Sequence, residues 1–121
     1  MREIKFRGKS IENKNIGEWV VGDLHLRSPF AHIHTGLGTK CKIDPNTVGQ
    51  FTGLKDKNTK DIYEGDIVIR HGRGVAKDSR GVVLYQSGQF VISMLCPLYY
   101  DIQDIEVIGN IHDNPELLKS L

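Results

Sequence analysis

The sequence predicts a mainly β fold, either a barrel or a sandwich. Three observations lead to this prediction: apolar residues alternate in several short runs, turn residues separate those runs, and only the last residues carry a helical pattern. A length of 121 residues suits one hydrophobic core. We therefore expect a single domain over residues 1–121, with an N-terminal β subregion over about 1–50, a barrel-like subregion over about 51–113 and a terminal helix over about 114–121.

The first half contains three candidate strands and one candidate turn of helix. The run "EIKFR" alternates, and "EWVVGDLHL" is β-branched or aromatic at its centre, where Gly22 indicates a bend or bulge. The short run "AHIHTG" follows the turn signal Ser28-Pro29. Asp44 before Pro45 predicts a single helical turn, because aspartate caps helices and proline suits their first position.

The second half shows clearer elements. The runs "GVVLY" and "FVISML" flank the short loop "QSGQ", which is typical of a β-hairpin. The runs "IVIR" and "DIEVIGNI" supply two more strands. At the end, Asn114 can cap a helix that starts at Pro115, and Leu117, Leu118 and Leu121 give it an apolar stripe. We expect so short a helix to pack against the domain or against a second subunit.

The stretch "TGLKDKNTKDIYEGDIVIR" carries the strongest turn signals in the chain. It lacks the clustered glycines and the following helix that a phosphate-binding loop needs. We expect Gly65 to supply a backbone conformation that other residues resist, and Asp66 to bond neighbouring amides in the turn. The stretch is therefore interpreted as a structural turn that delivers the chain into a strand.

Composition and charge narrow the class of protein. No apolar run is long enough for a membrane helix, and the N-terminus lacks the apolar core of a secretory signal, so we expect a cytoplasmic protein without membrane contact. Cys41 and Cys96 lack the paired spacing of a zinc site and are too few for a disulfide scaffold. A net charge of +1 disfavours a strongly electrostatic nucleic-acid binder.

The net charge nevertheless hides a gradient along the chain. Residues 1–42 hold eight Lys and Arg against four acids, residues 43–80 hold seven against six, and residues 81–121 hold one against five. Such a gradient could place a basic and an acidic face on one molecule, which would favour head-to-tail self-association.

Several weak candidate sites remain. Glu64 and Asp66, like Asp104 and Glu106, sit two positions apart, but surface carboxylates explain these pairs better than catalysis does. Trp19 and Phe51 are expected to fill the core.

His32 and His34 would share one strand face, as two metal ligands must, and His25 or Cys41 could supply a third ligand. The alternative is an outward polar face with Ile33 directed inward. We expect no metal, with His32 and His34 as weak candidates.

The best nucleic-acid candidate is the run "IRHGRGVAKDSRG". It places Arg70, Arg73, Lys77 and Arg80 around a Gly-rich loop, and flexible basic loops of small barrels can follow a phosphate backbone.

Four blocks of the sequence together resemble the YopX family of small proteins from phages and prophages of Gram-positive bacteria. They are "MREIKFRGKS", "GEWVVGDL", "DPNTVGQFTGLKDKNTKDIYEGDIV" and "VIGNIHDNPELL". The resemblance implies a phage or prophage origin and a β-rich fold whose second half is similar to a small SH3-like barrel. With the elements expected above, the predicted fold is mainly β, with additional N-terminal strands and a short C-terminal α-helix. It implies no activity, catalytic residue or cofactor. Where the family usually has Asn-Gly, this chain has Asn58-Thr59, so its turn could be of another type.

These observations favour a non-enzymatic phage or prophage accessory protein without a cofactor. We expect a protein-binding or self-assembling module that forms a homo-oligomer or binds an unknown phage or host protein. The alternative is a nucleic-acid-binding module that acts through the basic loop from Arg70 to Arg80.

Overall fold

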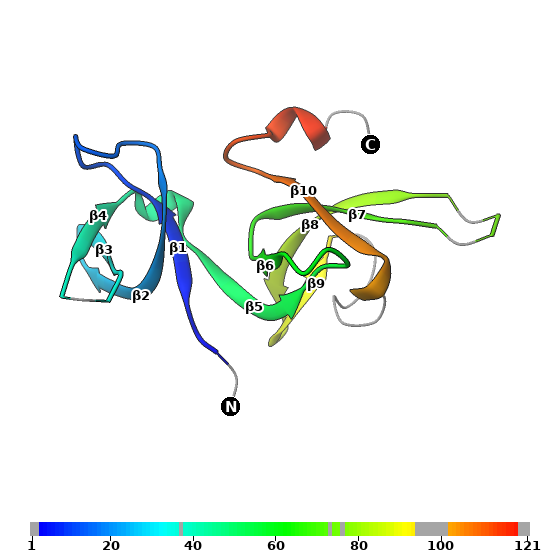
Figure 1. Ribbon diagram of the computed structural model, residues 1–121, viewed down its shortest axis with the longest axis horizontal. Coiled ribbons are helices and arrows are strands. Elements are labelled where there is room, and N and C mark those ends of the chain that lie inside the picture. The colour runs from blue at the N-terminus through cyan, green and yellow to red at the C-terminus, as the bar shows by residue number, and fades with distance from the viewer. Residues whose placement is uncertain (1–2, 37, 73, 76, 94–101, 119–121) are drawn as a thin grey trace. The chain divides into compact units, whose positions relative to one another are not determined.

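The computed structural model describes residues 3–36, 38–72, 74–75, 77–93 and 102–118 (Figure 1). Within these residues the chain forms ten β-strands and short 3-10 turns. It divides into two compact units, Met1–Phe51 and Thr52–Leu121. Strand β5 belongs to both, since its first residues lie in the first unit and its last residues in the second.

The first unit is an antiparallel sheet with the hydrogen-bonded order β4-β3-β2-β1-β5. Its strands are β1 (Phe6–Lys9), β2 (Trp19–Arg27), β3 (Phe30–His34), β4 (Lys40–Ile43) and the start of β5 (Gly49–Lys55). Between β4 and β5, Pro45–Thr47 forms one 3-10 turn, η1, and the Asp44 side chain accepts a hydrogen bond from Asn46 N.

One face of this sheet carries the core of the first unit. Leu24 lies opposite Ile33, and Ile33 lies opposite Cys41, so apolar residues of three strands meet on one side. Phe6 and Val48 pack against the same cluster. The buried cluster comprises Val20, Ala31, Ile33, Cys41 and Ile43.

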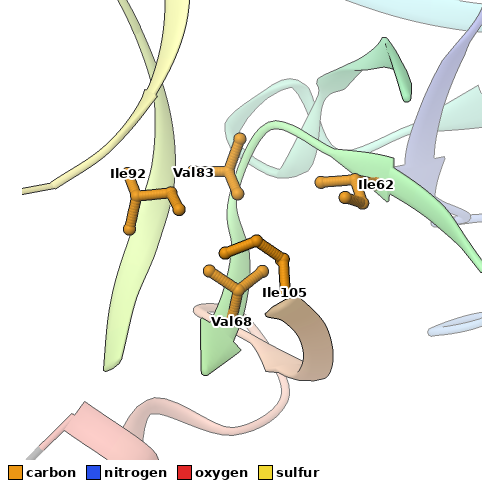
Figure 2. Close-up of a cluster of buried hydrophobic side chains, with 5 residues drawn as sticks. All are labelled: Ile62, Val68, Val83, Ile92 and Ile105. Atoms are coloured by element: carbon orange, nitrogen blue, oxygen red, sulfur yellow. The ribbon is translucent and has the colours of Figure 1, made fainter. Parts of the chain in front are cut away.

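The second unit contains a four-stranded antiparallel sheet of order β10-β7-β8-β9, together with the pairing of β5 and β6. Its strands are β6 (Asp61–Tyr63), β7 (Asp66–Arg70), β8 (Ser79–Gln86), β9 (Gln89–Ile92) and β10 (Ile105–Asn110). Figure 2 shows its buried cluster, to which each of these five strands contributes one side chain. They are Ile62, Val68, Val83, Ile92 and Ile105.

The predicted hairpin in the second half is confirmed. Strands β8 and β9 pair in register from Val83 and Ile92 to Gln86 and Gln89. The two residues between them, Ser87 and Gly88, both have positive φ, at 52° and 79°. Two consecutive positive φ angles are typical of a type I′ turn, which suits the twist of the flanking strands.

Asp56 organises the turn between β5 and β6. Its side chain is 6% exposed, and Oδ1 accepts hydrogen bonds from the backbone N–H groups of Asn58 and Lys60, at 2.8 and 2.9 Å. Oδ2 accepts a third bond, of 2.9 Å, from Val107 N in β10. One buried carboxylate thereby closes the turn and attaches it to the last strand. Thr59, in the same turn, has a φ of 66°.

The mainly β prediction is confirmed, but two finer expectations need correction. The described strands form open sheets with edge strands and no closed barrel; the likeness to an SH3-like barrel stays a prediction. The expected terminal α-helix is a four-residue 3-10 turn, η3 (Pro115–Leu118), and residues 119–121 lie outside the described part. Asn114 Oδ1 accepts a bond from Asn110 N, so this side chain serves the preceding chain rather than the first amides of a helix.

We predict that Thr59→Gly stabilises the protein. Left-handed backbone costs a β-branched residue roughly 1–2 kcal/mol, and glycine removes this cost. Glycine also raises the conformational entropy of the unfolded chain, which offsets roughly 0.4–1 kcal/mol of the gain. The net gain in unfolding free energy should be about 0.5–1 kcal/mol. Denaturant unfolding measures it, with Asn58→Gly as the matched control, because Asn58 does not have a positive φ and glycine there should destabilise. Equal effects of the two substitutions would contradict the prediction.

We predict that Asp56→Asn lowers the unfolding free energy by about 2 kcal/mol, since an amide nitrogen at the Oδ2 position cannot accept the Val107 N–H. Thermal or denaturant unfolding measures the loss. Asp44→Asn is the control: that side chain accepts one exposed N–H, and asparagine caps as well as aspartate, so the change should stay within about 0.5 kcal/mol. Similar stability of both variants would show that the Asp56 bonds contribute little.

Candidate functional site

The side of the first sheet that faces away from its core has a distinctive composition. Residues directly opposite each other share a face, and successive residues of a strand alternate, so the registers of β1–β4 fix its members. Strands β2, β3 and β4 lie side by side (Figure 1). We call this side the outer face; it carries Arg7, Lys9, Trp19, Val21, Asp23, His25, Arg27, Phe30, His32, His34, Lys40 and Lys42. Among these strand residues five are Lys or Arg, and Asp23 is the single acid.

Cations and aromatic rings are interleaved on the outer face. Lys42 Nζ lies 3.8 Å from the centroid of the Phe30 ring. Arg7 Cζ and Lys9 Nζ lie 4.6 and 5.5 Å from the Trp19 ring. These are cation–π distances, and each contact holds a flexible cationic side chain against the sheet surface.

The three histidines of the outer face lie together. His25 is directly opposite His32, and the rings of His25 and His34 stack with centroids 4.0 Å apart and a tilt of 31°. Partial burial lowers the pKa of His34 below its usual value, and the nearby charges of His25, Lys40 and His32 lower it further, while Asp23 opposes them. The three histidines therefore form one electrostatic group with Lys40 and Asp23.

A metal site at His32 and His34 is not formed by the described residues. No group of three or more His, Cys, Asp or Glu residues among them is arranged to hold a metal ion. Cys41 points into the core, where its Sγ donates a bond of 3.3 Å to Ser10 Oγ. Of the possible third ligands, only His25 joins His32 and His34 on the outer face, and its ring stacks on that of His34.

Two arginines of the basic loop that the sequence suggested, Arg70 and Arg80, do not share one surface. Ile69 lies opposite Arg80, and Arg70 lies opposite Ser79, so Arg70 and Arg80 are directed to opposite faces of the β7–β8 pair. Arg80 Nη1 donates to Leu117 O at 3.2 Å. Lys77 is exposed, and Arg73 lies outside the described residues.

At the base of that loop, His71 lies between two carboxylates. Its Nε2 is 2.8 Å from Glu106 Oε1 and its Nδ1 is 3.6 Å from Asp78 Oδ2. Asp78 Oδ1 also accepts a bond from Gly72 N. These two acids contact the start of the loop at His71 and Gly72.

Gly65 and Asp66 lie in the interior of the second unit. Gly65 has a φ of 93°; its N–H donates to Val83 O, and its carbonyl accepts from Ile111 N. Asp66 is 2% exposed, and its Oδ2 accepts from Tyr63 N at 2.8 Å. Both residues therefore form hydrogen bonds that stabilise the backbone around this turn. Glu106 of the other carboxylate pair contacts His71, as described above.

A family model described as YopX protein matches residues 5–119. The chain belongs to the YopX family. Among solved structures, this YopX protein is similar to the crystal structure of protein EF1440 from Enterococcus faecalis, with 26% identity and a TM-score of 0.65 over 98% of this chain and 100% of that chain. No curated protein matches it. These matches assign no activity.

Sequence reasoning missed the outer face, although its signal is present in the chain. Outer-face cations alternate with core residues, as in "KCKI", and the basic surplus of residues 1–42 is concentrated there. Trp19, expected in the core, is half-buried on the outer face, because it shares its side of β2 with Val21 and lies opposite Lys9. Phe51 is buried, and Lys5 Nζ lies 4.7 Å from its ring centroid.

The lowered pKa of His34 predicts how its charge responds to neighbours and to pH. His25→Gln should raise the His34 pKa, because it removes a like charge, and Asp23→Asn should lower it further, because it removes an opposite one. NMR titration of the His34 ring measures both shifts, and shifts of the opposite signs would contradict the arrangement. Since the folded pKa lies below the unfolded one, the contribution of His34 to stability is fully present above about pH 6.5 and is lost as the pH falls from there through the lower folded pKa.

Proposed function

We propose that this YopX protein is a non-enzymatic binding module that holds nucleic acid on the outer face of its first unit. The observation that carries the proposal is the coincidence of five Lys or Arg residues, three histidines and two larger aromatic rings on one side of β1–β4, against one acid. A cationic surface with aromatic rings between the charges suits a ligand that has both phosphates and bases.

The charges supply the affinity in this proposal. Binding of phosphates by Lys and Arg releases condensed counterions, so affinity falls as salt rises. What matters is the local density of positive charge, and the first unit holds eight Lys and Arg against five acids, whereas the second holds eight against ten. The overall charge of +1 is therefore compatible with a cationic interface.

The proposal also covers the class, the origin and the location of the protein. Three carboxylates of the second unit, Asp56, Asp66 and Asp78, accept bonds from backbone N–H groups, which supports structural roles for these acids and a non-enzymatic protein without a cofactor. The family resemblance supports a phage or prophage protein that works in the cytoplasm of a bacterial host. No helix of the described residues is long and apolar enough to cross a membrane.

Protein binding and self-association stay predictions, and the geometry favours them less than it favours nucleic acid. One reason to expect them was a terminal helix that needed a packing partner, together with the charge gradient along the chain. Leu117 of η3 already packs within the chain, since its Cδ1 lies 2.9 Å from the position that a Cβ on Gly109 would occupy. The charge difference between the units remains as the motive for head-to-tail contact.

We predict that the double variant Arg27→Ala, Lys40→Ala weakens binding to an oligonucleotide and makes its salt dependence shallower. Each lost phosphate contact should reduce the slope of log K against log salt by about 0.7 to 0.9. Both side chains are exposed, so folding should be unaffected. Fluorescence anisotropy across a salt series measures both quantities.

The control for this variant is Lys57→Ala, Lys77→Ala, which removes the same charge from exposed positions of the second unit. It should leave affinity and slope nearly unchanged. If the control loses affinity and the outer-face variant does not, the interface lies in the second unit, as the basic-loop alternative holds. No binding by the unaltered protein at about 50 mM salt would overturn the proposed function.

A further inference from the structure

We propose that the nucleic acid held on the outer face is single-stranded, and that Phe30 provides a ring on which one of its bases stacks. This inference rests on the proposed function and names the substrate class of the same site. It is carried by the placement of the rings along β3 and by the width of the sheet.

The spacing of the rings on β3 does not match a stacked duplex. Phe30, His32 and His34 occupy alternate positions of one strand, so their points of attachment repeat about every 6.6 Å. Base pairs of a duplex repeat about every 3.4 Å. A nucleic-acid strand that lies along β3 can therefore place successive bases on these rings only if the bases are unstacked from one another.

The sheet is also too broad to enter a groove of duplex DNA. Neighbouring strands lie about 4.8 Å apart, and the three strands β2, β3 and β4 lie side by side around these rings, so their backbones alone span roughly 10 Å. The major groove is about 12 Å wide and admits a helix or a two-stranded ribbon. A duplex on the outer face would offer phosphates to the cations but no base faces to the rings, which would then add nothing to binding.

Phe30 is the ring best placed to receive a base. It is 47% exposed, lies directly opposite Arg27 and has the Lys42 ammonium above it. An exposed cation–π contact is weak, whereas stacking of a base on an aromatic side chain is stronger. When a base arrives, the Lys42 ammonium can leave the ring and pair with the adjoining phosphate, so the lysine exchanges one partner for a better one.

The His25 and His34 pair extends the platform along the same strand. The two rings already stack at 4.0 Å, and His25 is exposed, so an incoming base can continue the stack. Protonation of His34 adds charge to a surface that contains His25, Lys40, Lys42, Arg27, His32 and one acid, Asp23, with Glu12 at its edge accepting a bond from Lys42 N. Lower pH should accordingly strengthen binding.

The test compares labelled oligonucleotides by fluorescence anisotropy at about 50 mM salt. The probes are a thymidine oligomer and a uridine oligomer of about 16 nucleotides, the upper range of site size for one small β-barrel binder, and a duplex of equal length. We expect at least one single strand to bind about tenfold more tightly than the duplex. The Phe30→Ala variant should lose about tenfold in affinity for that strand, keep its affinity for the duplex and keep the salt slope of the unaltered protein.

Two further variants separate stacking from other roles of the residue. Phe30→Trp should retain single-strand affinity, since it keeps an aromatic face, whereas Phe30→Leu, which keeps apolar volume without one, should behave as Phe30→Ala does. Tyr85→Ala is the matched control: Tyr85 is 55% exposed and lies in the second unit, packed edge-on against Phe90. It should leave binding unchanged, and thermal unfolding checks that each variant is folded.

The outcomes distinguish this inference from the function on which it rests. Equal affinity for duplex and single strand, or a Phe30→Ala variant that binds the single strand normally, would overturn the inference and leave the proposed function standing. Absence of binding to all three probes would overturn the proposed function, and the inference with it.

Discussion

Directly opposed residues of an antiparallel pair must lie on the same face of a sheet, and the outer face of this YopX protein depends on that constraint. Ile33 faces Leu24 on one side and Cys41 on the other, which fixes β2, β3 and β4 in one register. The residues between them in each strand must then point to the outer face, where His32 lies between His25 and Lys42. A slip by one residue would expose the core and bury the cations, so the apolar cluster that folds the first unit also assembles its charged surface.

The second unit uses charged groups in the opposite way. Asp56 and Asp66 are buried, and each satisfies backbone N–H groups at a point where the chain changes direction. A carboxylate that accepts several N–H bonds offsets the cost of its own burial, and it holds turns that apolar contacts alone would leave loose. Acids of this unit thus act as parts of the scaffold, whereas cations of the first unit are presented on a surface. This difference is the reason for placing the interface in the first unit.

Most of the strands and turns could be predicted from the sequence, but the residues of the outer face could not. Alternating runs and turn residues predict strands because burial on one face imposes a period of two, and the Ser87-Gly88 turn follows from the same local rules. The terminal helix was predicted from a cap and a leucine stripe, but Asn114 Oδ1 accepts a bond from Asn110 N instead, and the described residues that follow form one 3-10 turn. The arginines of the loop look clustered in sequence, yet register sends Arg70 and Arg80 to opposite faces. Conversely, Arg27, Phe30 and Lys42 are brought together only by strand pairing.

Net charge describes the whole chain and not one surface, for a related reason. A value of +1 averages over two units, eight cations against five acids in one and eight against ten in the other, while a phosphate responds to the field within about one Debye length. On the outer face the acid Asp23 stands among five Lys and Arg residues, and the rings of Phe30 and Trp19 keep three of these cations, Lys42, Arg7 and Lys9, close to the sheet surface. Cations held this way lose less conformational freedom when a ligand binds. A small module with almost no net charge can therefore bind a polyanion, provided that register has sorted its charges onto one face.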